Sequence, residues 1–193
     1  MGIRRFSTSN LSGTKSSKIW DQETTLGTFE SISTVLVTTA QSSITFSNIP
    51  QGYTDLQLRS YWGFTDTSNN TWLNVQFNGD AGSNYSYHAI RSAAAGFVMS
   101  ASYATTKMSF GSDVLGNASS WAVSIADIFS YSSTSKNKTI KAFAGQDNNG
   151  TGTANLWSGM WNSQNAVTSL VINTDSSTFR VGSMFSLYGI RGA

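Results

Sequence analysis

The chain has 193 residues, 39% hydrophobic and 12% aromatic, which is enough apolar material for the core of one large domain. Only 11% of the residues are charged, against roughly 25% in an average soluble domain, which argues against amphipathic helices and favours β-structure with uncharged polar faces. There is no cysteine, which excludes disulfides and thiolate metal sites, and no apolar run of about 18 residues that would predict a membrane span.

The net charge of +2 is concentrated near the N-terminus. Residues 1–20 contain Arg4, Arg5, Lys15 and Lys18 and no acid, so they carry +4, whereas the other 8 basic and 10 acidic residues sum to −2. The same segment is rich in Ser and Thr but also contains Phe6, Ile19 and Trp20. We interpret residues 1–27 as an extended basic arm that becomes ordered against a partner, the alternative being a frayed terminus. The N-terminus lacks the apolar stretch of a secretory signal.

From residue 29 onward, short segments with period-two alternation are separated by turns containing Gly, Asn and Asp. The expected strands are 31–38, 44–46, 56–62, 73–77, 85–90, 97–103, 107–110, 121–129, 138–145, two pieces within 156–161, 167–173 and 179–190. No segment has the period of a helix. The sequence therefore predicts an all-β protein, an antiparallel β-sandwich or jelly roll over residues 28–193, preceded by the N-terminal arm.

The prediction of a sandwich depends most on the last segment, residues 179–190. Phe179, Val181, Phe185 and Leu187 share one face of a long strand, so we expect this face to lie in the core. A strand this apolar requires a neighbour on each edge and a second layer against its inner face.

Residues that could carry catalysis are few. His88 is the only histidine, and it lies in a segment rich in tyrosine, where a packed or edge position is more common than a catalytic one. Asp127 interrupts the apolar face of 121–129, whose other face contains alanines and Ser124 and predicts close approach of a neighbouring element. We expect Asp127 to be a buried carboxylate paired with Arg or backbone donors, with a catalytic acid as the alternative. The sequence predicts no enzymatic activity.

Two loops, 78–84 and 147–150, contain oxygen ligands that calcium could use, but neither has EF-hand spacing and turn chemistry alone explains both. We therefore expect no metal and no cofactor. No glycine-rich phosphate loop and no basic stripe on the folded part are present, so nucleic acid is not an expected partner.

Large aromatic residues could form a platform for sugar rings. The candidates are Trp157, Trp161, Trp72, Tyr61 and Tyr87, of which we single out Trp157 and Trp161 for a glycan or subunit contact. The alternative, which we prefer, is that such residues fill the core or a subunit interface.

Six motifs occur in order along most of the chain: SSKIWDQ (16–22), FESI (29–32), ITFSNIP (44–50), LQLR (56–59), FNGDAGSNY (77–85) and FSLYGIRG (185–192). Together they resemble small β-sandwich virion proteins of tailed bacteriophages, including cyanophages. The resemblance implies a capsid decoration, cement or fibre protein that is located in the virion and assembled in the bacterial cytoplasm.

We therefore expect a capsid decoration or cement protein whose arm binds the major capsid protein or another virion protein. The expected arm contacts are Arg4, Arg5, Phe6, Lys15, Lys18, Ile19 and Trp20. We also expect a homo-oligomer, with a trimer as the preferred form, and neither nucleic acid nor membrane as partner. The first alternative is a tail-fibre or receptor-binding module that recognises host surface glycans, and a weaker one is a glycan depolymerase, which the shortage of acids disfavours.

Overall fold

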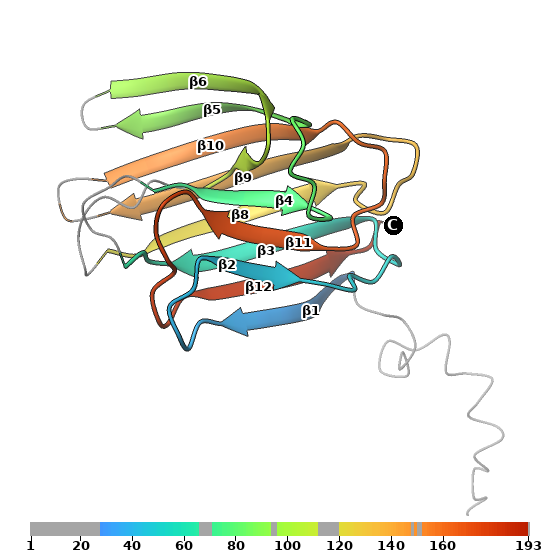
Figure 1. The fold of residues 1–193 in the computed structure, drawn as a ribbon, viewed down its shortest axis with the longest axis horizontal. Coiled ribbons are helices and arrows are strands. Elements are labelled where there is room, and N and C mark those ends of the chain that lie inside the picture. Colours follow the sequence, from blue (N-terminus) through green and yellow to red (C-terminus); the bar gives the residue numbers. More distant parts are fainter. Residues whose placement is uncertain are drawn as a thin grey trace, which may run out of the picture.

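The computed structural model describes residues 28–65, 71–93, 96–111, 120–147, 149 and 152–192. Within these ranges the chain forms β-strands and no helix (Figure 1). The strands are β1 (Phe29–Leu36), β2 (Ser43–Phe46), β3 (Asp55–Trp62), β4 (Leu73–Phe77), β5 (Tyr85–Ala93), β6 (Gly96–Thr105), β7 (Met108–Ser109), β8 (Ala122–Phe129), β9 (Lys138–Asp147), β10 (Gly152–Trp161), β11 (Leu170–Thr174) and β12 (Met184–Ile190). The all-β prediction is confirmed, although β10 is one continuous strand instead of two pieces.

The strands form two antiparallel sheets. The larger sheet has eight strands in the order β1-β12-β3-β8-β9-β10-β5-β6, and the smaller has four in the order β2-β11-β4-β7. Figure 1 shows β2, β11 and β4 in front of the larger sheet, and buried residues of both sheets form one hydrophobic cluster. This confirms the predicted antiparallel sandwich. The predicted arm, residues 1–27, lies outside the described residues.

Strands β8 and β9 place their small side chains in the core. Ala122 and Ala126 of β8 and Ala142 and Ala144 of β9 are buried, whereas the large side chains that alternate with them are exposed. These alanines belong to the same hydrophobic cluster as large side chains of the smaller sheet, such as Phe77. Ile128 and Ile140 are buried on the same face as the alanines, whereas Val123, Ile125 and Phe143 are exposed on the opposite face. The close approach predicted for the alanine face stays a prediction.

The closing segment differs from its prediction. Strand β12 begins at Met184 because the chain turns at Gly182, whose φ of +93° is unfavourable for residues with a side chain. Phe179 and Phe185 are buried as expected, but Val181 lies in the turn and is 56% exposed. The expected neighbours are present, since β12 pairs with β1 on one edge and with β3 on the other.

Candidate functional site

A polar and aromatic hollow lies where the two sheets meet, and its mixture of polar and aromatic side chains makes it a candidate ligand site. It has a volume of about 210 Å³ and is lined by residues from β4, β5, β7, the end of β6, the β6–β7 connection and the segment after β11. Trp72, which directly precedes β4, and Tyr87 of β5 supply its aromatic side chains. Both are partly buried and pack against the core.

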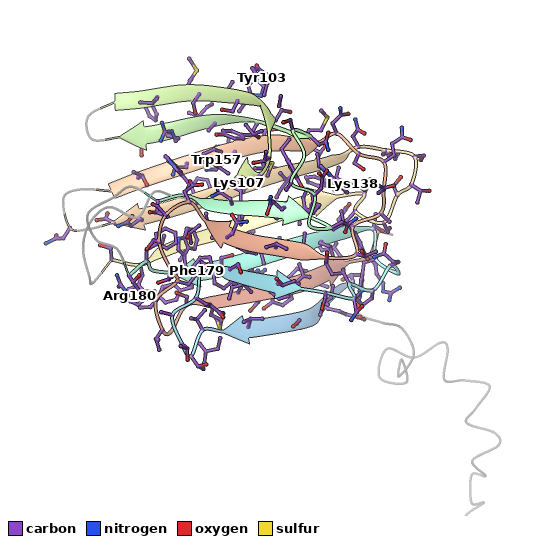
Figure 2. The ribbon with its side chains drawn as sticks, viewed as in Figure 1. Tyr103, Lys107, Lys138, Trp157, Phe179 and Arg180 are labelled. Carbon is purple, nitrogen blue, oxygen red and sulfur yellow. The ribbon has the colours of Figure 1, made fainter. Side chains whose placement is uncertain are left out.

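Trp157 of β10 packs against both of these rings. Its ring meets Trp72 edge-on with centroids 5.6 Å apart and meets Tyr87 in the same manner at 5.4 Å. The guanidinium carbon of Arg91 lies 4.7 Å from the Trp72 ring centroid, a cation–π contact. Because Trp157 is only 2% exposed, its packing holds the two partly exposed rings in fixed positions. Figure 2 labels Trp157 and also Lys107, the second of which lines the hollow.

A short polar network forms the remaining wall. Ser109 Oγ donates to Asn74 Oδ1 at 2.7 Å, and Asn74 Nδ2 donates to Asp175 Oδ1 at 3.1 Å. Lys107 Nζ pairs with the same Asp175 oxygen at 2.5 Å. Asn74 is 1% exposed, so its amide is fixed between Ser109 and Asp175. The hollow thus places an ion pair beside two aromatic rings, an arrangement suited to binding a molecule with both hydroxyl groups and an apolar face.

Hydrolytic chemistry has little support in this hollow. Asp175 is the only acid among the described residues that line it, whereas glycoside hydrolysis generally uses two carboxyl groups on either side of the bond. Among the described residues, there is also no group of three His, Cys, Asp or Glu side chains that could hold a metal ion. The arrangement is suited to binding.

Trp157 and Trp161, the two residues singled out for a glycan or subunit contact, both lie in the core. Each is 2% exposed, so neither ring is available to a ligand at the surface, and the preferred core assignment agrees with the structure. Trp161 Nε1 donates to Asp80 Oδ2 at 2.7 Å and thereby anchors the loop 78–84. Of the other aromatic candidates, Trp72 and Tyr87 line the hollow, whereas Tyr61 stacks on Trp121 on the outer face of the larger sheet.

The carboxylate of Asp80 is engaged within its own loop. Besides the bond from Trp161, it accepts hydrogen bonds from Asn84 Nδ2 at 2.9 Å and from the Gly82 amide at 2.8 Å. These donors, Trp161 first, lower the pKa of Asp80 below its usual value. Turn chemistry accounts for the acid in this loop. The second loop, 147–150, is described only in part, and there Asp147 Oδ1 accepts from the Asn149 amide at 2.8 Å.

The prediction for Asp127 was wrong in its position and its partners. Asp127 lies on the outer face of β8 with its side chain 23% exposed, where it accepts from Gln57 Nε2 at 2.8 Å and faces Lys141 Nζ at 3.7 Å. The face of β8 that carries Asp127 is the solvent side, because the alanines occupy the core. His88 is exposed on β5, and its Nε2 lies 3.0 Å from the Tyr103 hydroxyl.

Lys138 is a buried cation that the sequence did not single out. Its residue is 0% exposed, and its Nζ donates to the carbonyl oxygens of Ser133 at 2.7 Å, Lys136 at 2.6 Å and Gln164 at 3.3 Å. Burial lowers the pKa of this amine. Figure 2 places it at the end of the sandwich opposite Phe179 and Arg180. Its three carbonyl partners indicate a structural role, joining the loop before β9 to the segment after β10.

Comparison of the chain with protein-family models, curated proteins and solved structures finds no match.

The expected arm contacts Arg4, Arg5, Phe6, Lys15, Lys18, Ile19 and Trp20 lie outside the described residues. No described helix is long and apolar enough to cross a membrane.

Proposed function

We propose that this protein is a non-enzymatic structural component of a bacteriophage virion, a capsid decoration or cement protein attached to the shell through its N-terminal arm. The observation that carries the proposal is the concentration of charge and apolar anchors in residues 1–20, which contain four basic residues, no acid, and Phe6, Ile19 and Trp20. The six ordered motifs that resemble phage virion proteins support the same conclusion. The major capsid protein, or another virion protein, is the proposed partner.

The arm would bind by folding onto its partner. A polar segment that becomes ordered on binding loses conformational entropy at that moment, and the large contact area it covers offsets this loss. Phe6, Ile19 and Trp20 supply the buried anchors that dominate such interfaces. Arg4, Arg5, Lys15 and Lys18 attract an acidic shell surface and accelerate encounter, an effect that salt screens.

Deletion of residues 1–20 tests the attachment directly. Undecorated capsids are mixed with the full chain or the truncated chain, and co-sedimentation measures the bound fraction. We expect the truncated chain to stay in the supernatant while its circular dichroism remains that of a β-protein. Undiminished binding of the truncated chain would rule out the arm as the attachment.

Two full-length variants separate the contributions of charge and burial. Replacing Arg4, Arg5, Lys15 and Lys18 by Gln should weaken capsid binding at low salt and remove most of its salt dependence. Replacing Phe6, Ile19 and Trp20 by Ala should weaken binding at every salt concentration, because burial of apolar surface is not screened. Equal salt dependence in both variants would contradict this division of roles.

A receptor-binding module that recognises host surface glycans is the second candidate, and the hollow beside Trp72 and Tyr87 favours it. Aromatic faces stack on the apolar side of sugar rings, while Asn74, Lys107 and Asp175 offer hydrogen-bonding groups. Binding of the protein to a glycan array should be lost with Trp72→Ala or Tyr87→Ala. The matched control is Trp121→Ala, since Trp121 stacks on Tyr61 away from the hollow. Equal signals from all variants would remove this candidate.

A further inference from the structure

The outer face of the eight-stranded sheet, which points away from the smaller sheet, carries a straight row of exposed apolar side chains. Each residue of the row stands directly opposite the next across neighbouring strands. We call the following five residues the apolar row, in the order β6, β5, β10, β9, β8: Met99, Ile90, Leu156, Phe143 and Ile125. They are between 46% and 81% exposed. The core of the monomer gains nothing from their apolar character.

The apolar row contains a protrusion and a depression. Phe143 of β9 is 62% exposed and stands above the small residues beside it, Gly145 on the same strand and Ala154 on β10. On the other side of Leu156, a shallow hollow of about 220 Å³ is lined by Ile90, Met99, Leu156 and neighbouring residues of the same three strands. The protrusion and the hollow therefore lie on either side of β10.

From this arrangement we infer that a second copy of the chain packs on this face, with a two-fold axis that runs parallel to the strands above β10. Neighbouring strands are about 4.8 Å apart, so β9 and β5 are equally distant from such an axis. The rotation places Phe143 of each copy over Ile90 and the hollow of the other. Leu156 meets its own counterpart on the axis, and Met99 meets Ile125, which is the self-complementary pattern of an isologous interface.

The size of the face suits a stable pair. Five strands at about 4.8 Å spacing, with eight to ten residues each at about 3.3 Å, cover on the order of 700 Å² per copy. A standard protein–protein interface buries about 800 Å² per partner. Two sheets that pack face to face generally lie about 10 Å apart. The pairing therefore adds a second layer of the same kind.

Charge also favours a second copy over a charged partner. The apolar row contains no ionisable residue, and the next row on the same strands holds Asp127 and Lys141 directly opposite each other, 3.7 Å apart at their charged atoms. The proposed axis brings Asp127 of one copy over Ala101 of the other. It also brings Lys141 of one copy over His88 of the other, because Ser158, the β10 residue that stands between them in this row, lies below the axis. Asp127 therefore meets no other acid, and Lys141 meets no other lysine or arginine. Arg59, on β3, lies beyond the strands that overlap.

This pairing is independent of capsid attachment through the arm, so each can fail without the other. The first test is the mass of the full chain by analytical ultracentrifugation over a series of concentrations. We expect a reversible equilibrium between the 20.8 kDa chain and its dimer. The double variant Phe143→Lys, Leu156→Lys should raise the dimer dissociation constant at least tenfold. Val181→Lys, a change at another exposed apolar residue outside the row, should leave it unchanged.

Cross-linking locates the axis without relying on a disruptive variant. The chain has no cysteine, so Leu156→Cys provides a single thiol on the proposed axis. A short bis-maleimide should join two copies of this variant and leave Val181→Cys uncoupled. A monomer at every concentration, a trimer, or a dimer that cross-links equally through both positions would overturn the inference. So would a full chain that dimerises only after residues 1–27 are removed, because that segment would then cover the face.

Discussion

Replacing Tyr85 by Phe removes one buried hydroxyl that joins the two sheets. Tyr85 begins β5 in the larger sheet and is 1% exposed, whereas its hydroxyl reaches the end of β4 in the smaller sheet. There it accepts a hydrogen bond from the Phe77 amide at 2.9 Å and donates one to the Asp80 carbonyl at 3.0 Å. Phe keeps the ring and its packing but leaves the Phe77 amide without this acceptor. At neutral pH we expect Tyr85→Phe to lower the free energy of unfolding by about 1–3 kcal/mol.

The same hydroxyl makes the difference between the two proteins depend on pH. Burial, aided by the nearby Asp80 charge, raises the pKa of Tyr85 from 10.0 to about 12. Above pH 10 the unfolded chain therefore loses the Tyr85 proton while the folded chain still holds it, so the wild type loses stability as pH rises from 10 to 12. A shift of this size corresponds to about 2–3 kcal/mol. The Phe variant lacks this group, so the advantage of the wild type should nearly vanish at pH 12.

Urea unfolding of both proteins at a series of pH values measures this prediction. Other tyrosines and lysines titrate in both proteins, and their contributions cancel in the difference between the two free energies. A difference that stays constant from pH 7 to pH 12 would refute the argument, because it would mean that the hydroxyl titrates equally in the folded and unfolded chains. A neutral-pH difference near zero would show instead that its two hydrogen bonds are not important for stability.

Three further predictions concern other buried contacts. Lys138→Met should lower the free energy of unfolding by about 2–4 kcal/mol, because three carbonyls lose a charged donor. The control is Lys136→Met at an exposed neighbouring position, which should change the unfolding free energy by less than about 0.5 kcal/mol in the same urea titration. Trp161→Phe should lower the free energy of unfolding by about 1–3 kcal/mol at neutral pH, because it removes the hydrogen bond to Asp80. The pKa of Asp80 is lowered in the fold, so this carboxylate stabilises the fold above its unfolded pKa of 3.8 and loses that effect as pH falls through the folded pKa. The difference in unfolding free energy between wild type and variant should therefore become smaller in acid. Trp157→Ala should lower the free energy of unfolding by about 3–5 kcal/mol, as measured by calorimetry. The same truncation at an exposed position should not cause a loss of this size.

Period-two alternation was sufficient to predict most strands and the sandwich class. It works because a strand with one buried face must alternate, and the turns between strands carry Gly, Asn and Asp. The segment 73–77 and the hairpin signal after it correspond to β4 and its turn, where Asn78 and Gly79 both have positive φ. The extension of β12 back to residue 179 failed because Gly182 fits the alternation by position, whereas its backbone turns.

The candidate site was only partly accessible to sequence reasoning. Trp72 and Tyr87 were named among the aromatic candidates, but the polar wall depends on pairing between distant segments. Asn74 and Asp175, for example, are 101 residues apart in the chain, and no local pattern relates them. Lys138 gave no signal because backbone carbonyls can be contributed by any residue type. Two of its acceptors, the carbonyls of Ser133 and Lys136, come from the preceding loop, and the third, that of Gln164, comes from the segment after β10.

Alternation identifies the two faces of a strand but does not say which one is buried. In β8 and β9, hydrophobicity alone would place Val123, Ile125 and Phe143 in the core, and this is why Asp127 was expected to be buried with them. The structure instead buries the alanines, together with Ile128 and Ile140, in the cluster that also contains large side chains of the smaller sheet. The large side chains on the other face then remain in water, where their apolar area does not stabilise the monomer. Alanines, Ile128 and Ile140 fill the inner face of these strands, while Val123, Ile125 and Phe143 are exposed on the outer one. This distribution fits the proposed pairing, with the core on one side and a second sheet on the other.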